Sequence, residues 1–218
     1  MKKQCKVQGC SAPVSGHGPY CTKHKATNRR HGAPDQRGIT KSGLRPYLAM
    51  VQRRIEKNEK LTIWTIADGR WLALVRYAEQ VEKTTMFRTD RWAAQEAQKL
   101  GVAVEPRLVV ETVLAMYLMR EQEAFRFKSD RAFRFQLVRR VRGLTRLNAK
   151  VWGDGESGRT KTVYSELPPK VTGVLSAWLI SVLGQIGVWM ARNERQTQER
   201  QRFRDEQFKQ GLTEIDFQ

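Results

Sequence analysis

Hydrophobic and polar residues recur with a helical period through most of the chain. After Pro46, the apolar residues Leu48, Val51 and Ile55 follow one another at spacings of three and four, and a longer stripe of the same kind runs from Leu61 to Val81. Apolar residues at these spacings share one face of an α-helix and can be buried together. The pattern predicts two amphipathic helices, the first opening at Pro46, because the fixed backbone of proline suits a first turn.

Start and stop signals delimit three more predicted helices. Serine, threonine and aspartate cap the free N–H groups of a first turn, proline suits the first helical position, and glycine favours a helix end. These rules predict one helix capped by Thr89-Asp90 and ending at Gly101, one opening at Pro106, and one capped by Ser129 and continuing to Leu147.

The hydrophobic period changes after the last of these helices. Residues 149–152 and 161–164 are short runs with strand character, and they flank the turn-rich segment Gly-Asp-Gly-Glu-Ser-Gly at residues 153–158. Two such runs joined by a glycine-rich turn predict a β-hairpin at about residues 149–164. A long helical signal follows over residues 169–210. The sequence therefore predicts a mostly α fold with one hairpin.

Part of that last helix carries no charge. Residues 171–190 are 20 consecutive uncharged positions, which is the length of a bilayer span. The segment also contains glycine, serine and threonine, and its large apolar residues gather on one side. Because stripes of small residues allow close helix packing in soluble cores as in membranes, we expect a central helix of a soluble bundle. A membrane span at residues 171–190 is the alternative.

The net charge of +18, from 40 basic and 22 acidic residues, is concentrated in two short blocks. Residues 1–45 hold 10 basic residues and 1 acidic residue, and residues 126–150 hold 9 and 1, so the two blocks carry net charges of +9 and +8. Like charges crowded together repel one another in a folded protein, and a polyanion relieves that repulsion. We therefore expect a nucleic-acid partner, with a basic surface kept only for solubility as the alternative.

Three cysteines and one histidine have the spacing of a structural metal site. They follow the pattern Cys-x4-Cys-x10-Cys-x2-His and are Cys5, Cys10, Cys21 and His24. Three thiolates and one imidazole complete a tetrahedral Zn²⁺ shell and leave no position for water or a substrate. The sequence predicts structural zinc as the cofactor, with His17 or His31 as alternatives to the fourth ligand.

The rest of the first 40 residues is rich in glycine, proline and basic residues and lacks a helical period. A segment of this size with few apolar side chains needs a metal or a disulfide to fold. We expect a zinc-binding basic module over residues 1–40, with a flexible exit at residues 29–34, and a helical domain over residues 41–218.

The sequence Cys5-Lys-Val-Gln-Gly-Cys10, with Tyr20-Cys21-Thr-Lys-His24 and Arg29-Arg30-His31-Gly32 after it, resembles the small N-terminal zinc modules of phage and other mobile-element proteins. Many of those proteins are HNH-type endonucleases. The resemblance, which covers residues 5–34, implies that Cys5, Cys10, Cys21 and His24 hold the metal and that the basic residues after them contact nucleic acid. The HNH catalytic motif has no counterpart, because all three histidines lie within the first 31 residues.

The second basic block interleaves arginines with phenylalanines. The unit Ala-Phe-Arg-Phe occurs at residues 124–127 and again at residues 132–135. Arginine can meet a phosphate while a ring stacks on a base, although we expect most of these rings to be core anchors. The predicted nucleic-acid contacts are Lys23, Lys25, Arg29, Arg30, Arg37, Lys41, Arg131, Arg134, Arg139, Arg142, Arg146, Lys150, Arg159 and Lys161.

A basic helix followed directly by a hairpin is also the order of a winged helix, in which the helix enters the major groove. The helix opened by Pro106 would then support the basic helix. Asp154 and Glu156 at the expected hairpin tip oppose a phosphate contact there.

No catalytic constellation is found, since a histidine base outside the zinc module is impossible and the acids of the body lie on ordinary amphipathic helices. No apolar run follows the basic start, so we expect no secretory signal. We expect a non-catalytic zinc protein of a phage or mobile element that binds nucleic acid, DNA rather than RNA, in the cytoplasm. The alternatives are an adaptor or inhibitor acting on a protein, or on a second copy, through residues 171–210, and the membrane-associated protein described above.

Overall fold

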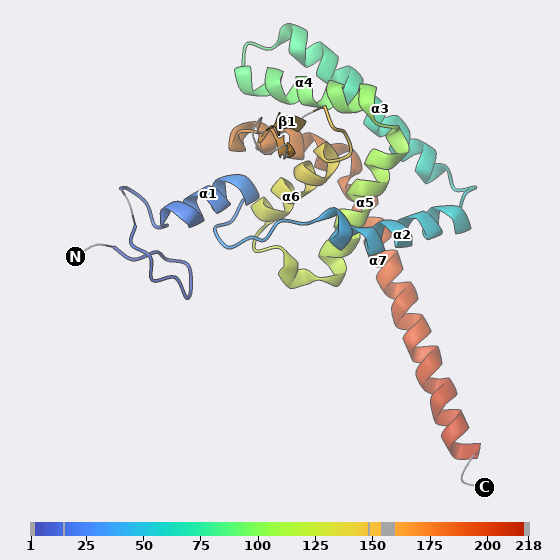
Figure 1. The fold of residues 1–218 in the computed structure, drawn as a ribbon. Coiled ribbons are helices and arrows are strands. Elements are labelled where there is room, and N and C mark those ends of the chain that lie inside the picture. The colour runs from blue at the N-terminus through green and yellow to red at the C-terminus, as the bar shows by residue number, and fades with distance from the viewer. Residues whose placement is uncertain (1–2, 15, 148, 154–159, 216–218) are drawn as a thin grey trace.

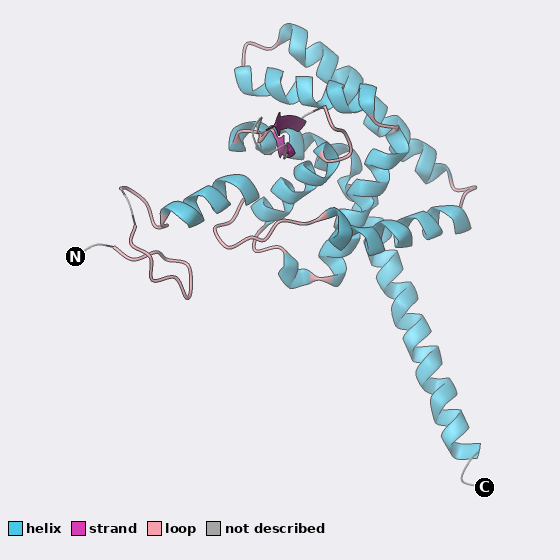
Figure 2. Cartoon of the chain, viewed as in Figure 1, coloured by secondary structure: helices cyan, strands magenta, loops and turns pink. Residues whose placement is uncertain are grey.

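The computed structural model describes residues 3–14, 16–147, 149–153 and 160–215, and it describes only the backbone of residues 149–153, 160–164 and 211–215. The described part is mostly helical, as predicted (Figure 2). Its elements in chain order are α1 (Thr22–His31), α2 (Lys41–Lys57), α3 (Thr62–Thr84), α4 (Arg88–Ala103), α5 (Pro106–Gln122), the short 3₁₀ helix η1 (Ala124–Arg126), α6 (Asp130–Arg142), β1 (Ala149–Gly153), β2 (Thr160–Tyr164) and α7 (Pro169–Ile215).

Helix α5 forms the centre of the fold (Figure 1). Its residues from Val109 to Met119 are buried without interruption, so the helix has no solvent-facing side over three turns. A helix that is covered on every side must lie inside a larger assembly of elements. Helices α2, α3, α6 and α7 supply that cover.

The first half of α7 packs into this core through one stripe. Its buried apolar residues recur every three or four positions and are Val171, Leu175, Leu179, Leu183, Ile186 and Met190. Glycines on α7 let the ring of Tyr117 on α5 come close, because a β-carbon at Gly187 would lie 2.5 Å from that ring. By length and composition α7 could cross a membrane, yet 50% of its most apolar window is buried inside the fold.

The second half of α7 leaves the core. Residues 199–210 are all exposed, and the helix runs away from the other elements as a single rod (Figure 1). The predicted helix over residues 169–210 is therefore present, with its first half in the core and its second half in solvent.

Helix starts agree with two of the predicted signals. Pro106 occupies the first turn of α5, and the hydroxyl of Ser129 accepts a hydrogen bond of 3.1 Å from the backbone N–H of Ala132 at the start of α6. The predicted end of α6 was wrong, because the helix stops at Arg142 and not at Leu147. Gly143 follows as the C-cap, and its N–H bonds back to the carbonyl of Arg139.

Three other predicted limits were also wrong. Helix α4 begins at Arg88 with Phe87 as its N-cap, so Thr89 and Asp90 lie inside its first turn and do not cap it. Helix α2 starts at Lys41. Thr40 is its N-cap, and the hydroxyl of Thr40 accepts a hydrogen bond from the N–H of Gly43, so Pro46 lies inside the helix. Proline has no N–H to donate to the carbonyl of Ser42, four residues earlier. Pro46 and Ser42 are both exposed, so that carbonyl can bond to water instead. Helix α4 continues past Gly101, where the absence of a side chain allows close contact with α3.

The strands β1 and β2 pair antiparallel, with Ala149 opposite Tyr164 and Gly153 opposite Thr160. They are the two strands drawn in Figure 2, and they lie between α6 and α7 in the chain. The expected hairpin tip with Asp154 and Glu156 lies outside the described residues.

Candidate metal centre and basic surface

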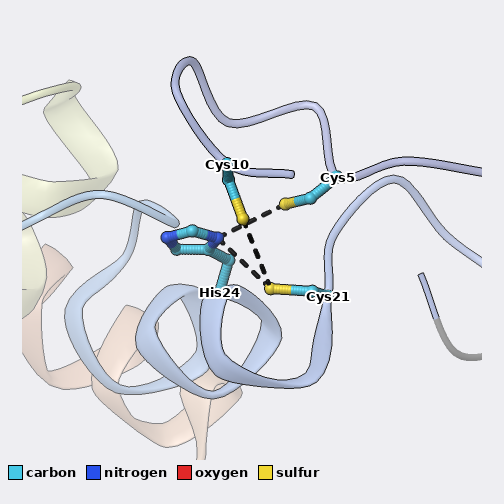
Figure 3. Close-up of side chains that lie close together, drawn as sticks. All are labelled: Cys5, Cys10, Cys21 and His24. Carbon is cyan, nitrogen blue, oxygen red and sulfur yellow. Dashed lines mark hydrogen bonds between the residues drawn. The ribbon is translucent and has the colours of Figure 1, made fainter. Parts of the chain in front are cut away.

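The four predicted ligands come together in one cluster (Figure 3). Nδ1 of His24 lies 3.3 Å from Sγ of Cys5 and 3.3 Å from Sγ of Cys21, and the sulfur atoms of Cys10 and Cys21 are 4.0 Å apart. All four ligand atoms lie within 4.8 Å of one another. Such a group of three thiols and an imidazole can hold a metal ion.

Local backbone structure places each of these side chains. The N–H of Cys10 bonds to the carbonyl of Val7, which closes a tight turn, and Gly9 in that turn has a positive φ of 76°. Cys21 is the N-cap of α1, and His24 lies in the first turn three residues later. Residues three apart lie on one face of a helix, so the pair Cys21/His24 faces the turn that carries the other pair.

The arrangement fits a tetrahedral metal shell. Sulfur at about 2.3 Å and nitrogen at about 2.0 Å from one Zn²⁺ stand about 3.5–3.8 Å apart at tetrahedral angles, close to the distances between these atoms. Burial of Cys5 favours its neutral thiol, but hydrogen bonds from the backbone of Cys21 and Val7 and from His24 outweigh it and lower the pKa to about 6. The thiolate that a metal requires is thus already favoured at one ligand.

The alternative histidines do not join the cluster. His17 is exposed in the loop before α1, and Nδ1 of His31 lies 3.0 Å from Nε2 of Gln136 on α6. Burial, followed by the nearby charges of Arg139 and Arg30, lowers the pKa of His31 to about 4. His31 is therefore a neutral group at the contact between α1 and α6.

The segment after α1 is anchored on the helical core, which corrects the expectation of a flexible exit. Gln136 is buried, and its Oε1 accepts a hydrogen bond of 2.9 Å from the N–H of Ile39. Gln36 is also buried, and its side chain bonds to the N–H of Lys128 at 3.0 Å and to the carbonyl of Arg126 at 3.2 Å. Sequence reasoning missed both glutamines, because an isolated glutamine belongs to no pattern.

Helices α1 and α6, which carry most of the predicted nucleic-acid contacts, lie against each other. Gly32, at the end of α1, has a positive φ of 87°, and a β-carbon there would lie 2.7 Å from the backbone oxygen of Arg131. Only glycine fits this approach. The contact joins the last turn of α1 to the first turn of α6, and the two helices lie next to each other in Figure 1. The exposed predicted contacts on these two helices are Lys23, Arg29, Arg131 and Arg134.

Other predicted contacts are occupied within the protein. Nε of Arg142 lies 2.8 Å from the carboxylate of Glu96 on α4, its Nη1 donates to the carbonyl of Ser165, and its side chain is 11% exposed. Arg30 pairs with Glu166. Arg139 is half-buried, and burial lowers its pKa.

The remaining predicted contacts are dispersed. Arg37 and Lys41 are exposed before and at the start of α2, and Arg146 is exposed after α6. Lys25 is half-buried on α1. Arg159 lies outside the described residues, and only the backbone of Lys150 and Lys161 is described.

No protein family model matches the chain, and no curated protein or solved structure matches it. The function is therefore argued from the side chains and their arrangement. Two features carry that argument, namely the Cys/His cluster and the contact between the basic helices α1 and α6.

Proposed function

We propose that this chain is a non-catalytic, zinc-stapled nucleic-acid-binding protein, and that DNA lies against α1 and the first half of α6. One observation carries the proposal: two basic helices far apart in the sequence are packed together. Lys23, Arg29 and Arg134 are exposed and have no acidic partner among the described residues, and the guanidinium of Arg131 lies 5.1 Å from the ring centre of Phe135. Unpaired cations on two adjoining helices suit a phosphate backbone.

Zinc would be held by Cys5, Cys10, Cys21 and His24 in a structural role. The closed donor set leaves no place for a substrate, so the ion would fix the orientation of α1. Free thiols of this kind persist in a reducing compartment, which supports the cytoplasm as the location. The resemblance of residues 5–34 supports a phage or other mobile element as the source.

The β1–β2 hairpin follows α6 in the order that a winged helix uses. We propose that it lies beside the bound duplex and that Lys150 and Lys161 extend the basic surface. In this arrangement Arg142 supports the fold through Glu96 and does not contact phosphate.

The test is a charge-neutralised variant with Arg29→Gln, Arg131→Gln and Arg134→Gln. Its control neutralises three exposed arginines on the distal part of α7, namely Arg200→Gln, Arg202→Gln and Arg204→Gln. Binding to labelled duplex DNA is measured over a salt series, with duplex RNA in parallel. We expect the first variant alone to lose affinity, and its log–log salt slope to fall by about 0.9 for each lost phosphate contact. Equal losses in both variants would contradict the proposed surface.

One observation favours a second function, that of an adaptor. The distal part of α7 exposes Phe203 and Phe208 and packs against no other described element. A partner protein could cover these rings. Binding that survives high salt and is lost in the double variant Phe203→Ser, Phe208→Ser would support this function over the first.

A further inference from the structure

The two copies of the unit Ala-Phe-Arg-Phe contain four phenylalanine rings, and one of them differs from the other three in its exposure to solvent. Phe127, Phe133 and Phe135 are buried, with 9% exposure or less, and so act as the core anchors that we expected. Phe125 is 94% exposed and contributes nothing to the core. The same four-residue unit therefore has two buried rings in its second copy and one solvent-facing ring in its first.

The chain on both sides of Phe125 is anchored. Glu123 accepts a hydrogen bond from the hydroxyl of Tyr47 on α2, and the N–H of Arg126 bonds back to the carbonyl of Glu123 at 2.9 Å. Phe127 packs edge-on against Phe133, with the ring centres 5.3 Å apart. Phe125 is thus displayed by a short 3₁₀ turn with fixed ends, and its exposure is not the result of a loose segment.

One side of this turn adjoins a basic segment of the chain. A β-carbon at Gly43, in the first turn of α2, would lie 3.8 Å from Nη2 of Arg126, so η1 adjoins the start of that helix. Exposed cations there have no acidic partner among the described residues, and they are Arg37, Lys41 and Arg45. The nearby acids are already engaged, since Glu123 lies 3.8 Å from Arg126 and Asp35 lies 3.9 Å from Lys128.

We propose that Phe125 and these cations bind single-stranded nucleic acid, with the ring stacked on an unpaired base and the cations on the adjacent phosphates. A ring needs the open face of a base, and the bases of a duplex already stack on one another, whereas an unpaired strand offers that face. The inference rests on the proposed nucleic-acid function and adds a second surface with its own preference. Single strands of DNA and of RNA both offer open bases and phosphates, and the affinity measurement below distinguishes between them.

The test compares Phe125→Ala with Phe125→Tyr, which keeps an aromatic ring, and with the control Phe87→Ala, which removes another exposed ring from the turn between α3 and α4. Fluorescence anisotropy measures the affinity of each full-length, metal-loaded variant for single-stranded DNA, single-stranded RNA and duplex DNA of one sequence. We expect Phe125→Ala to weaken binding of at least one single strand by about fivefold or more and duplex binding by less than about twofold. Phe125→Tyr and Phe87→Ala should bind as the wild type does.

Three results would overturn the inference: unchanged single-strand affinity in Phe125→Ala, an equal loss for single strands and duplex, or a wild-type protein that binds duplex but no single strand. None of these results by itself contradicts the proposed binding of duplex by α1 and α6, which the arginine variant tests separately. A wild-type protein that binds no nucleic acid at any salt concentration would overturn both. The strand that shows the larger loss identifies the ligand as DNA or RNA.

Discussion

The metal module and the α5 core hold their structure by different means. Helix α1 has no buried residue, and four ligand atoms converge at its first turn. Helix α5 is buried from Val109 to Met119 and carries none of the four metal-ligand side chains. With a metal bound, the first region would depend on a few strong bonds at one point, whereas the second depends on many weak contacts spread over its surface. The two regions should therefore respond to different perturbations.

Removal of the metal should give the largest effect. Zinc binding to small modules is worth about 10–16 kcal/mol, and α1 has no buried residue whose packing could replace it. We expect a chelator, or Cys21→Ser, to abolish hydrogen-exchange protection in α1 and to leave α5 protected. The control Lys23→Ala should change neither. A helix α1 that stays protected without metal would show that the two regions do not differ in this way.

Truncation of a core side chain should destabilise the helical core and leave the metal module unchanged. Leu114 is fully buried on α5, and Leu114→Ala should cost about 2–5 kcal/mol of unfolding free energy, measured by urea denaturation. Leu108→Ala makes the same change at a half-exposed position on the same helix and should cost less than about 1 kcal/mol. The metal should stay bound in both variants, because its ligands lie within residues 5–24. Loss of metal from Leu114→Ala would mean that the regions fold as one unit.

The contact that anchors residues 32–39 on α6 can be broken without touching the metal ligands or α5. Gln136→Leu removes the acceptor for the buried N–H of Ile39 and should cost about 1–3 kcal/mol. Hydrogen exchange should increase in residues 32–39, while the metal cluster and α5 keep their protection. Gln80→Leu, at an exposed position on α3, is the matched control. If exchange in residues 32–39 stays slow, other contacts hold this segment on α6.

The smallest effect concerns pH. The folded protein holds His31 at a pKa of about 4, below its ordinary value of 6.5, so the unfolded chain takes up the proton first as pH falls. Stability is therefore lost as pH falls from about 6.5 toward about 4, by less than about 1 kcal/mol after solvent screening. Urea denaturation of the metal-loaded protein at several pH values should show a weaker dependence in His31→Asn than in the wild type. Any release of metal at low pH affects the wild type and His31→Asn alike, so it does not account for a difference between them. An equal pH dependence in the two proteins would contradict the proposed effect of His31.

Much of the metal site was predictable because it is local. The ligands lie within 20 residues, and their Cys-x4-Cys-x10-Cys-x2-His spacing alone identified the four that the structure brings together. Helix α1 itself was missed, because its polar residues carry no apolar period. Basic residues show a limit of another kind. Arg134 and Arg142 look alike in the sequence, yet one is exposed and the other pairs with Glu96, 46 residues away.

The sequence by itself determined the helical class, the ligand set and the concentration of charge, since periodicity, spacing and composition are properties of the chain read residue by residue. Only the tertiary structure decided which of four similar phenylalanines faces solvent, and that two glutamines anchor the segment after α1. Burial and hydrogen-bond partners depend on which elements meet in space. For Gln136 and Ile39 the partner lies 97 residues away, beyond the reach of any local pattern.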